Sequence, residues 1–381
     1  ELKERSSMGN PVLASLAKKL KAFDASKQKV MVGLDGFVDL IIDVVDKRTG
    51  PEAYTRVETI ADLGARISRA SGLSSNLELV VRQEKLGGNG PIMANAMIEA
   101  GCAVTYIGSL GRPSVHPVFA EMAKRCKACH SLAAPGTTDA LEFRDGKVMM
   151  GKHQSLKEVT YGRMLEVVGK ANLKAIWEKS NLIALTNWTM LTAQTEIWKR
   201  LHKDMSGVKA PSGAILFTDL ADPEKRAEKE IAEAVGFLKK FRSSHRVVLG
   251  VNQKESMEVG AALGMQFDPA EIEKNAVALR QVLDLDAVVI HPTRNAACAT
   301  EKGSAIIDGP YCQNPKLTTG AGDNFNAGFC IGLLAGLEPV EMLAAGVSNS
   351  GYYVRSGKSA SSKDLVAFVG QWDKRFGDPT F

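Results

Sequence analysis

The segment Leu317-Thr318-Thr319-Gly320-Ala321-Gly322-Asp323 opens the most informative part of the chain, and an apolar run extends it to residue 337. The apolar run predicts a helix, and the small residues 320–322 let backbone N–H groups turn outward at its N-terminus. Free N–H groups and the helix dipole make such a terminus a binding site for anions. Asp323 adds a carboxylate beside that site, and the combination favours phosphoryl transfer.

A purely structural interpretation of the same segment is also open. Gly328, Gly332 and Gly336 recur every four residues, which would line one helix face with glycine and allow close packing against a neighbouring helix. The segment lacks the third glycine of a dinucleotide fingerprint and does not spell a Walker loop. Spacing alone does not separate an anion site from a packing face.

The composition predicts a globular protein whose cysteines are free thiols. The 381 residues are 45% hydrophobic and 24% charged, with a net charge of +5. Basic and acidic residues alternate in stretches such as 223–242, so we expect no nucleic-acid partner. No run of about 20 apolar residues and no signal peptide is visible, so we expect no membrane partner. Six scattered cysteines do not resemble a disulfide framework, which favours the cytoplasm.

Cys126, Cys129 and His130 have the spacing of a c-type haem attachment site. Neither a distal haem ligand nor further zinc ligands at suitable spacing accompany them. The simpler interpretation is that a helix at 118–125 ends here and enters a strand.

Short apolar runs alternate with amphipathic segments along most of the chain. The predicted strands are 29–35, 102–107, 182–186, 214–219, 247–251 and 287–291. The predicted helices are 12–23, 92–100, 163–179, 193–204, 224–241, 339–355 and 362–376. This alternation predicts an α/β fold with a doubly wound, mostly parallel sheet flanked by helices. We expect a single domain over 1–381, with residues 1–28 as an N-terminal helical leader.

Two carboxylates follow the first predicted strand. Asp35 and Asp39 lie at its carboxyl end, where open α/β sheets bind their ligands. Aspartate beside glycine is also common in turns, so binding and turn formation remain equally open for both residues.

Residues 318–323, with Phe325, Ala327 and Gly328, resemble the second signature of the ribokinase/PfkB carbohydrate-kinase family, D-T-x-G-A-G-D-x-F-x-A-G. The resemblance implies that Asp323 is the catalytic base and that the amides of Gly320, Ala321, Gly322 and Asp323 form an anion hole. Leu317 stands where the family has an aspartate that binds a monovalent cation, so we expect no activation by potassium.

Residues 86–94 resemble the first family signature, G-G-x-x-x-N-x-A, through Gly87, Gly88 and Ala94. The resemblance implies sugar binding by these glycines, by Asn89 and by Asp39, with Asp35 close by. Ile92 replaces the asparagine that contacts substrate in many members, so we expect a substrate other than ribose. Segments 37–86 and 130–155 correspond to the family's β-lid, with a helix near 57–70 as an insertion and a hairpin turn at 145–146.

The nucleotide side shows one match and one departure. Asn252 and Glu255 resemble the family's N-x-x-E motif, which implies Mg²⁺ held mostly through water, although the same spacing is also that of a helix capping box. The T-x-G-x-x-G motif expected after residue 290 is absent, and Arg294 is either a phosphate ligand in its place or a surface residue. Thr319 and Asn349 complete the expected nucleotide site.

Together these features predict an ATP- and Mg²⁺-dependent kinase that phosphorylates a hydroxyl of a sugar or polyol, with a possible homodimer through the lid. A nucleoside kinase of the same fold is one alternative, which Phe37 or Trp188 projecting into the sugar pocket would favour. A non-catalytic nucleotide- or sugar-binding member is the other.

Overall fold

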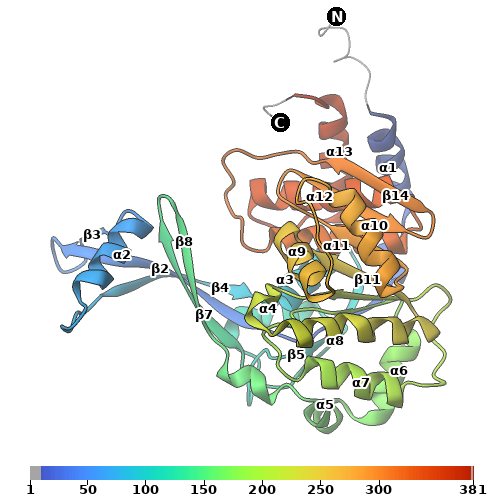
Figure 1. The fold of residues 1–381 in the computed structure, drawn as a ribbon, viewed down its shortest axis with the longest axis horizontal. Coiled ribbons are helices and arrows are strands. Elements are labelled where there is room, and N and C mark those ends of the chain that lie inside the picture. The colour runs from blue at the N-terminus through green and yellow to red at the C-terminus, as the bar shows by residue number, and fades with distance from the viewer. Residues whose placement is uncertain (1–9, 379–380) are drawn as a thin grey trace, which may run out of the picture.

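Nine strands form one twisted sheet in the order β14-β13-β12-β11-β10-β9-β1-β5-β6 (Figure 1). The computed structural model describes residues 10–378 and 381. The strands are β1 (Lys29–Gly33), β5 (Ala103–Gly108), β6 (Ala128–Ser131), β9 (Leu182–Leu185), β10 (Ile215–Asp219), β11 (Arg246–Val251), β12 (Ala287–Ile290), β13 (Asn295–Thr300) and β14 (Gly303–Asp308). All are parallel except the antiparallel edge strands β13 and β14.

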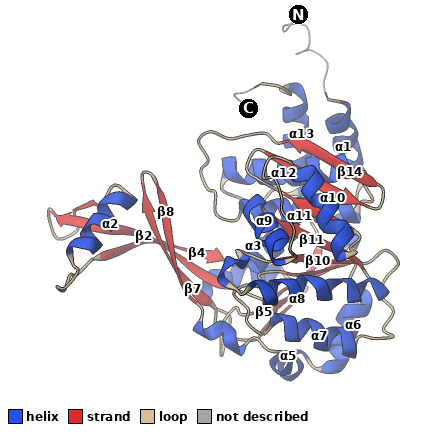
Figure 2. Cartoon of the chain, in the orientation of Figure 1, coloured by secondary structure: helices blue, strands red, loops and turns tan. Residues whose placement is uncertain are grey.

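Helices cover both faces of this sheet (Figure 2). One face is covered by α1 (Pro11–Ala22), α3 (Asn89–Glu99), α4 (Ala120–Arg125), α11 (Ala321–Leu334), α12 (Pro339–Ser356) and α13 (Ser362–Lys374). The other is covered by α5 (Tyr161–Val168), α6 (Lys170–Lys179), α7 (Gln194–Asp204), α8 (Glu228–Leu238), α9 (Gln253–Ala262) and α10 (Ile272–Leu283). This is the predicted doubly wound architecture.

The alternation of side chains along β1 explains the two cores. Val30 and Val32 belong to the core under the first layer of helices, whereas Met31 belongs to the core under the second. Successive side chains of a strand point to opposite faces, so a strand buried on both sides is apolar throughout. β1 is also where the order of strands reverses, because the chain passes from β1 to β5 on one side and later to β9 on the other.

Two local predictions differ from the structure. The predicted helix 163–179 is two helices, because Gly169 adopts a φ of 80° between α5 and α6. The hairpin β13–β14 was not predicted, since alanine and cysteine dominate β13 and give it weak strand propensity.

A second, five-stranded sheet projects from the body (Figure 1). It comprises β2 (Phe37–Arg48), β3 (Tyr54–Arg56), β4 (Leu79–Gly87), β7 (Gly136–Phe143) and β8 (Gly146–Lys152), with α2 (Ile60–Arg69) packed on it. Leu63 of α2 is buried there against apolar residues of β2 and β7. We call this sheet with α2 the lid. It occupies the segments predicted for it, with its hairpin turn at residues 144–145.

The N-terminal helix α1 is integrated into the body. Leu13, Leu16 and Leu20 are buried in the main core, and α1 lies beside α13 (Figure 1). It is therefore part of the core and not a leader on the outside of the domain. Among residues 10–378, no helix combines the length and the apolar character needed to cross a membrane.

The glycines of α11 have the predicted packing role at two of three positions. A Cβ at Gly328 would lie 2.6 Å from the carbonyl oxygen of Ala345 in α12, and one at Gly332 would lie 2.9 Å from the Cα of Met342. Gly336 differs, because it follows the end of α11 with a φ of 66° and terminates the helix. α11 therefore lies against α12 at backbone contact.

Gly328→Ala should lower the free energy of unfolding by about 1–3 kcal/mol, because its methyl group has no room between α11 and α12. Gly236→Ala in α8 is the matched control, since a Cβ there meets nothing within 4 Å. That control should be neutral or slightly stabilising. Urea titration of both variants measures the difference, and equal stabilities would contradict the close packing.

Candidate active site

Two cavities meet at the turn formed by residues 318–323. The first, of about 380 Å³, is lined by Thr318, Ala321 and Gly322 of this turn. The second, of about 340 Å³, is lined by Thr319, Gly320 and Asp323. The turn therefore separates two spaces, each large enough for a small molecule, and presents a different set of residues to each.

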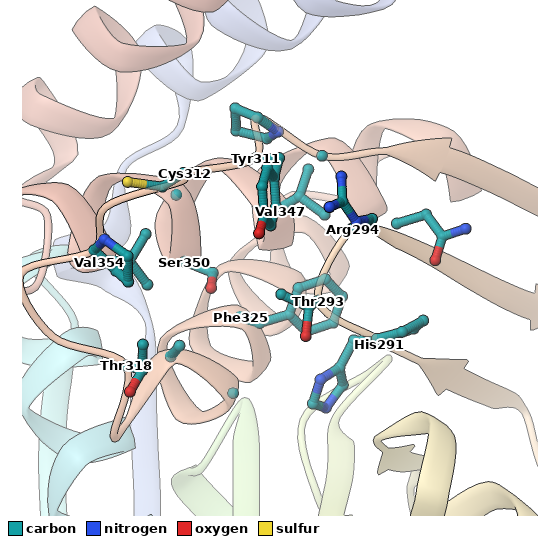
Figure 3. A pocket seen from close by; sticks show the side chains of 18 of the residues that line it. His291, Thr293, Arg294, Tyr311, Cys312, Thr318, Phe325, Val347, Ser350 and Val354 are labelled. Carbon is teal, nitrogen blue, oxygen red and sulfur yellow. The ribbon is translucent and has the colours of Figure 1, made fainter. Parts of the chain in front are cut away.

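The first cavity lies between the loops after β12 and β14 and the helices α11 and α12 (Figure 3). Its other lining residues include Asn252, His291, Arg294, Tyr311, Cys312, Val347 and Ser350. The guanidinium of Arg294 lies 4.0 Å from the ring centroid of Tyr311. Arg294 is thus an exposed, stacked residue on the rim of the cavity, compatible with either of the roles predicted for it.

The second cavity lies between the lid and the carboxyl ends of the central strands. Its other lining residues include Phe37, Asp39, Gly88, Asn89, Thr138, Met149, His153, Asn187, Lys225 and Glu255. Phe37 contacts His153 edge-on, at 5.4 Å between ring centroids. Trp188 does not line it, since its buried indole donates to Thr195 at 2.8 Å. Polar and apolar side chains therefore share the lining where the lid meets the body.

Asp323 is held in place at the start of α11. The side-chain amide of Asn89 donates to its Oδ1 at 2.9 Å. Burial raises the pKa of Asp323 well above 3.8, and the charges of Asp35 and Glu255 raise it further, whereas the Asn89 hydrogen bond lowers it. A buried, oriented carboxylate with a raised pKa is suited to accept a proton.

The turn before Asp323 needs glycine and leaves N–H groups free. Gly320 has a φ of 91°, and a Cβ there would lie 2.9 Å from the hydroxyl of Tyr353. The Ala321 amide donates to the Thr318 carbonyl at 3.1 Å, so it is occupied within the turn. Within the described residues, the amides of Gly320 and Gly322 make no such bond and remain for an anion at the helix N-terminus.

The Asp35 carboxylate holds neighbouring backbone and side-chain groups of the site in place. Its carboxylate is fully buried and accepts hydrogen bonds from the amides of Asn89 at 2.9 Å and Gly90 at 2.8 Å and from the side chain of Asn187 at 2.7 Å. Burial raises the pKa of Asp35 to about 6, although these bonds lower it. Asp35 lines neither cavity, so the expectation that it binds substrate is corrected to a positioning role.

Asp39 does face the second cavity. It is buried at the base of the lid, where a Cβ at Gly87 would lie 2.4 Å from its carboxylate carbon. Gly87 therefore makes room for this side chain and does not line the cavity itself. Burial raises the pKa of Asp39, and the Thr138 hydroxyl and the charges of Lys85 and Lys147 lower it.

Glu255 and Asn252 form the capping box that the spacing allowed. The Asn252 side chain accepts from the amide of Glu255 at 2.9 Å, and the Glu255 carboxylate accepts from the amides of Asn252 at 2.8 Å and Asp222 at 2.9 Å. Glu255 nevertheless lines the second cavity. Burial raises its pKa, and the backbone hydrogen bonds lower it.

The donor set near Glu255 fits a hard divalent cation. Asp219, at the end of β10, is buried, with Oδ2 bonded to Asn326 at 2.9 Å and Oδ1 without a partner in the described residues. Burial raises its pKa well above 3.8, and the charges of Glu255 and Asp323 raise it further. Carboxylate oxygens are ligands that Mg²⁺ prefers.

Two residues predicted on the nucleotide side lie elsewhere. Thr319 lines the second cavity instead of the first. Asn349 is buried between α11 and α12, where its side chain donates to the carbonyl of Asn324 at 2.7 Å, and it lines neither cavity. The neighbouring Ser350 lines the first cavity in its place, because successive helix residues point about 100° apart.

Several lining residues were not predicted. Asn187 follows β9 as Asp35 follows β1, so strand-end position could have identified it. His291 follows β12, and its ring stacks on Phe325 at 4.6 Å between ring centroids. Its Nε2 has no partner among the described residues, and burial lowers its pKa to about 4. His153 lines the second cavity from beside the lid, and Lys147 of the lid contacts the lining residue Thr319; the sequence carried no comparable signal for either.

Comparison with known proteins gives consistent results. Residues 13–372 match the family model for prokaryotic ketohexokinase. A ketohexokinase of Haloferax volcanii is 26% identical over 343 residues, which cover 90% of each chain. The fold is similar to that of an ATP-bound fructokinase from Xylella fastidiosa (TM-score 0.63, 10% identity, 91% of this chain and 99% of that one). It is also similar to Arabidopsis thaliana ribokinase complexed with ribose and ATP (TM-score 0.60, 16% identity, 90% and 98%).

Asp35→Ala should lower the free energy of unfolding by about 3 kcal/mol or more, because three buried N–H donors lose their acceptor. Asp139→Ala is the control, because it breaks an ion pair of the lid with Lys152, whose side chain is largely exposed. An ion pair of this kind contributes little, so the free energy of unfolding should change little. Urea unfolding of both variants checks this. Equal losses would show that Asp35 does not hold the site together.

Proposed function

Because the chain belongs to the prokaryotic ketohexokinase family and is therefore a sugar kinase, we propose that it transfers the γ-phosphoryl group of ATP to a hydroxyl of a ketohexose. One observation carries the proposal beyond family membership. The glycine turn separates two cavities, with Gly322 on one side and the Asp323 carboxylate on the other. A nucleotide in the first cavity and a sugar in the second would bring phosphoryl group and acceptor together at the turn.

In this proposal Asp323 takes the proton of the attacking hydroxyl. Asn89 orients its carboxylate, and the raised pKa makes the carboxylate a better proton acceptor than an exposed aspartate. The free amides of Gly320 and Gly322 stabilise the negative charge on the transferring group. Asp39, Asn89 and Asn187 supply acceptors and donors to the other sugar hydroxyls from the wall of the second cavity.

Glu255 and Asp219 are the residues that would hold magnesium, in part through water. Held there, magnesium would supply positive charge to offset the negative charge that develops on the phosphate during transfer. Met149 of the lid and His153 beside the lid cover the second cavity and exclude water that would compete with the sugar as acceptor.

A nucleoside acceptor is the second candidate, because Phe37 lines the second cavity and could stack on a base. A screen for ADP release with ketohexoses, aldohexoses, pentoses and nucleosides separates the two candidates. The proposal requires the highest kcat/KM with a ketohexose. A higher value with a nucleoside would overturn it.

Asp323→Asn should lower kcat by about 10²–10⁴-fold, because an amide cannot accept the proton. Since the base acts only when ionised, the wild-type rate should be full above the pKa of Asp323 and should fall as the pH falls through it. The raised pKa places this acid limb of kcat/KM above the range of an ordinary aspartate. Full turnover by the variant, or a limb near pH 4, would contradict the assignment.

Glu255→Gln should raise the magnesium concentration for half-maximal rate several-fold, because a negative charge is lost beside the ion. It should also lower the melting temperature, since glutamine has one acceptor oxygen for two backbone donors. Glu233→Gln in α8, whose carboxylate pairs with Lys199 on the surface, is the control and should leave the magnesium requirement unchanged. A lowered melting temperature with an unchanged magnesium titration would assign Glu255 to the capping box alone.

A further inference from the structure

One lysine of the lid reaches the turn between the two cavities. Lys147, near the start of β8, donates from Nζ to Oγ1 of Thr319 at 2.7 Å. Thr319 directly precedes Gly320, whose amide is one of the free donors for an anion. The contact joins residues 172 positions apart in the chain, so it places a lid cation beside the anion site.

Lys147 has no carboxylate within ion-pair distance among the described residues. Lys225, which lines the second cavity, is by contrast paired with Asp222 at 3.0 Å. The Lys147 side chain is half-buried, and its one recorded partner is a neutral hydroxyl. Its charge nonetheless acts on Asp39 and Lys85, whose pKa values it lowers. An ammonium so placed has donors left for an anionic ligand.

The register of β8 directs Lys147 toward the second cavity. Met149 and Gly151 line that cavity, and residues two apart in a strand share a face. Lys152, on the opposite face, instead pairs with Asp139 of β7 at 2.8 Å. Lys147 does not line the cavity itself, but it lies on the same face of β8 as these two residues and contacts Thr319, which does line it.

We propose that Lys147 is a further catalytic residue, which donates from its ammonium to the phosphoryl group during transfer. The inference rests on the proposed function. A ketohexose is neutral, so it does not form an ion pair with a lysine. The phosphoryl group is negatively charged, and it would lie close to Thr319 and Gly320 during transfer between the cavities. A charged hydrogen-bond donor at that point stabilises the transition state more than it stabilises the bound sugar.

The step balances without any change at the lysine. The acceptor oxygen forms a bond to the γ-phosphorus as the bond from that phosphorus to the bridging oxygen of ADP breaks. The hydroxyl proton passes to Asp323, and Lys147 keeps its three protons throughout. Its contribution is electrostatic, so arginine can supply part of it and methionine, of similar length, none.

The test compares Lys147→Met, Lys147→Arg and the control Lys152→Met with the wild type. We expect Lys147→Met to lower kcat about 100-fold, the loss typical of one transition-state donor, with KM for the sugar changed less than about threefold. The kcat of Lys147→Arg should lie within about tenfold of the wild-type value. The kcat of the control Lys152→Met should equal the wild-type value. Melting temperatures identify any variant that is merely unstable.

A second measurement does not depend on which sugar is accepted. ADP with aluminium fluoride mimics the transferring phosphoryl group, and its dissociation constant with magnesium should rise about 100-fold in Lys147→Met while that of ADP alone is unchanged. An equal aluminium-fluoride affinity in wild type and Lys147→Met would overturn the role of the lysine. If Lys147→Met weakens the binding of ADP with aluminium fluoride but the wild type does not phosphorylate ketohexoses, only the proposed acceptor would be overturned.

Discussion

The hydrogen bonds accepted by Asp35 are the interaction on which the site depends. Through them one carboxylate joins the end of β1, the first turn of α3 and the loop after β9. The first residue of α3, Asn89, in turn orients Asp323 at the start of α11. Two helices that begin more than 200 residues apart are thus aligned through a single buried group. The N-terminus of α3 also explains how a buried carboxylate is tolerated, because its amides provide the positive end of a helix dipole.

Much of the fold could be predicted from local patterns. Apolar runs such as 247–251 are buried on both faces, and that pattern is specific to the inner strands of a parallel sheet. The hairpin β13–β14 could not be predicted in the same way, because buried β13 consists mainly of residues with weak strand propensity and the edge strand β14 is largely exposed. The helix break at Gly169 could not be predicted because glycine is also tolerated inside helices, and its φ of 80° is visible only in the structure.

The sequence predicted which segments form the site, but it did not always predict which cavity a given side chain faces. The turn 318–323 lies at both cavities as expected, yet Thr319 faces the opposite cavity from the one predicted. Consecutive residues of a tight turn point in different directions, and sequence alone does not fix which one faces which space. Asp35 and Asn349 were misassigned for a related reason. The side chain of each forms a hydrogen bond with the backbone of another element, and the sequence does not show which elements pack together.

The distribution of charge explains why the lid matters to the chemistry of the body. Asp35, Asp219, Glu255 and Asp323 are all buried, and those that are ionised repel a phosphate group, so the body alone is a poor environment for one. The helix N-terminus offsets only part of this repulsion, because its effective charge is about half a unit. In the proposed mechanism the remaining positive charge would come from a metal ion near the carboxylates and from the lid, through Lys85 beside Asp39 and Lys147 beside Thr319. A lid that brings cations to a carboxylate-rich body completes the electrostatics of the site as well as covering it, so its contact with the turn bears directly on phosphoryl transfer.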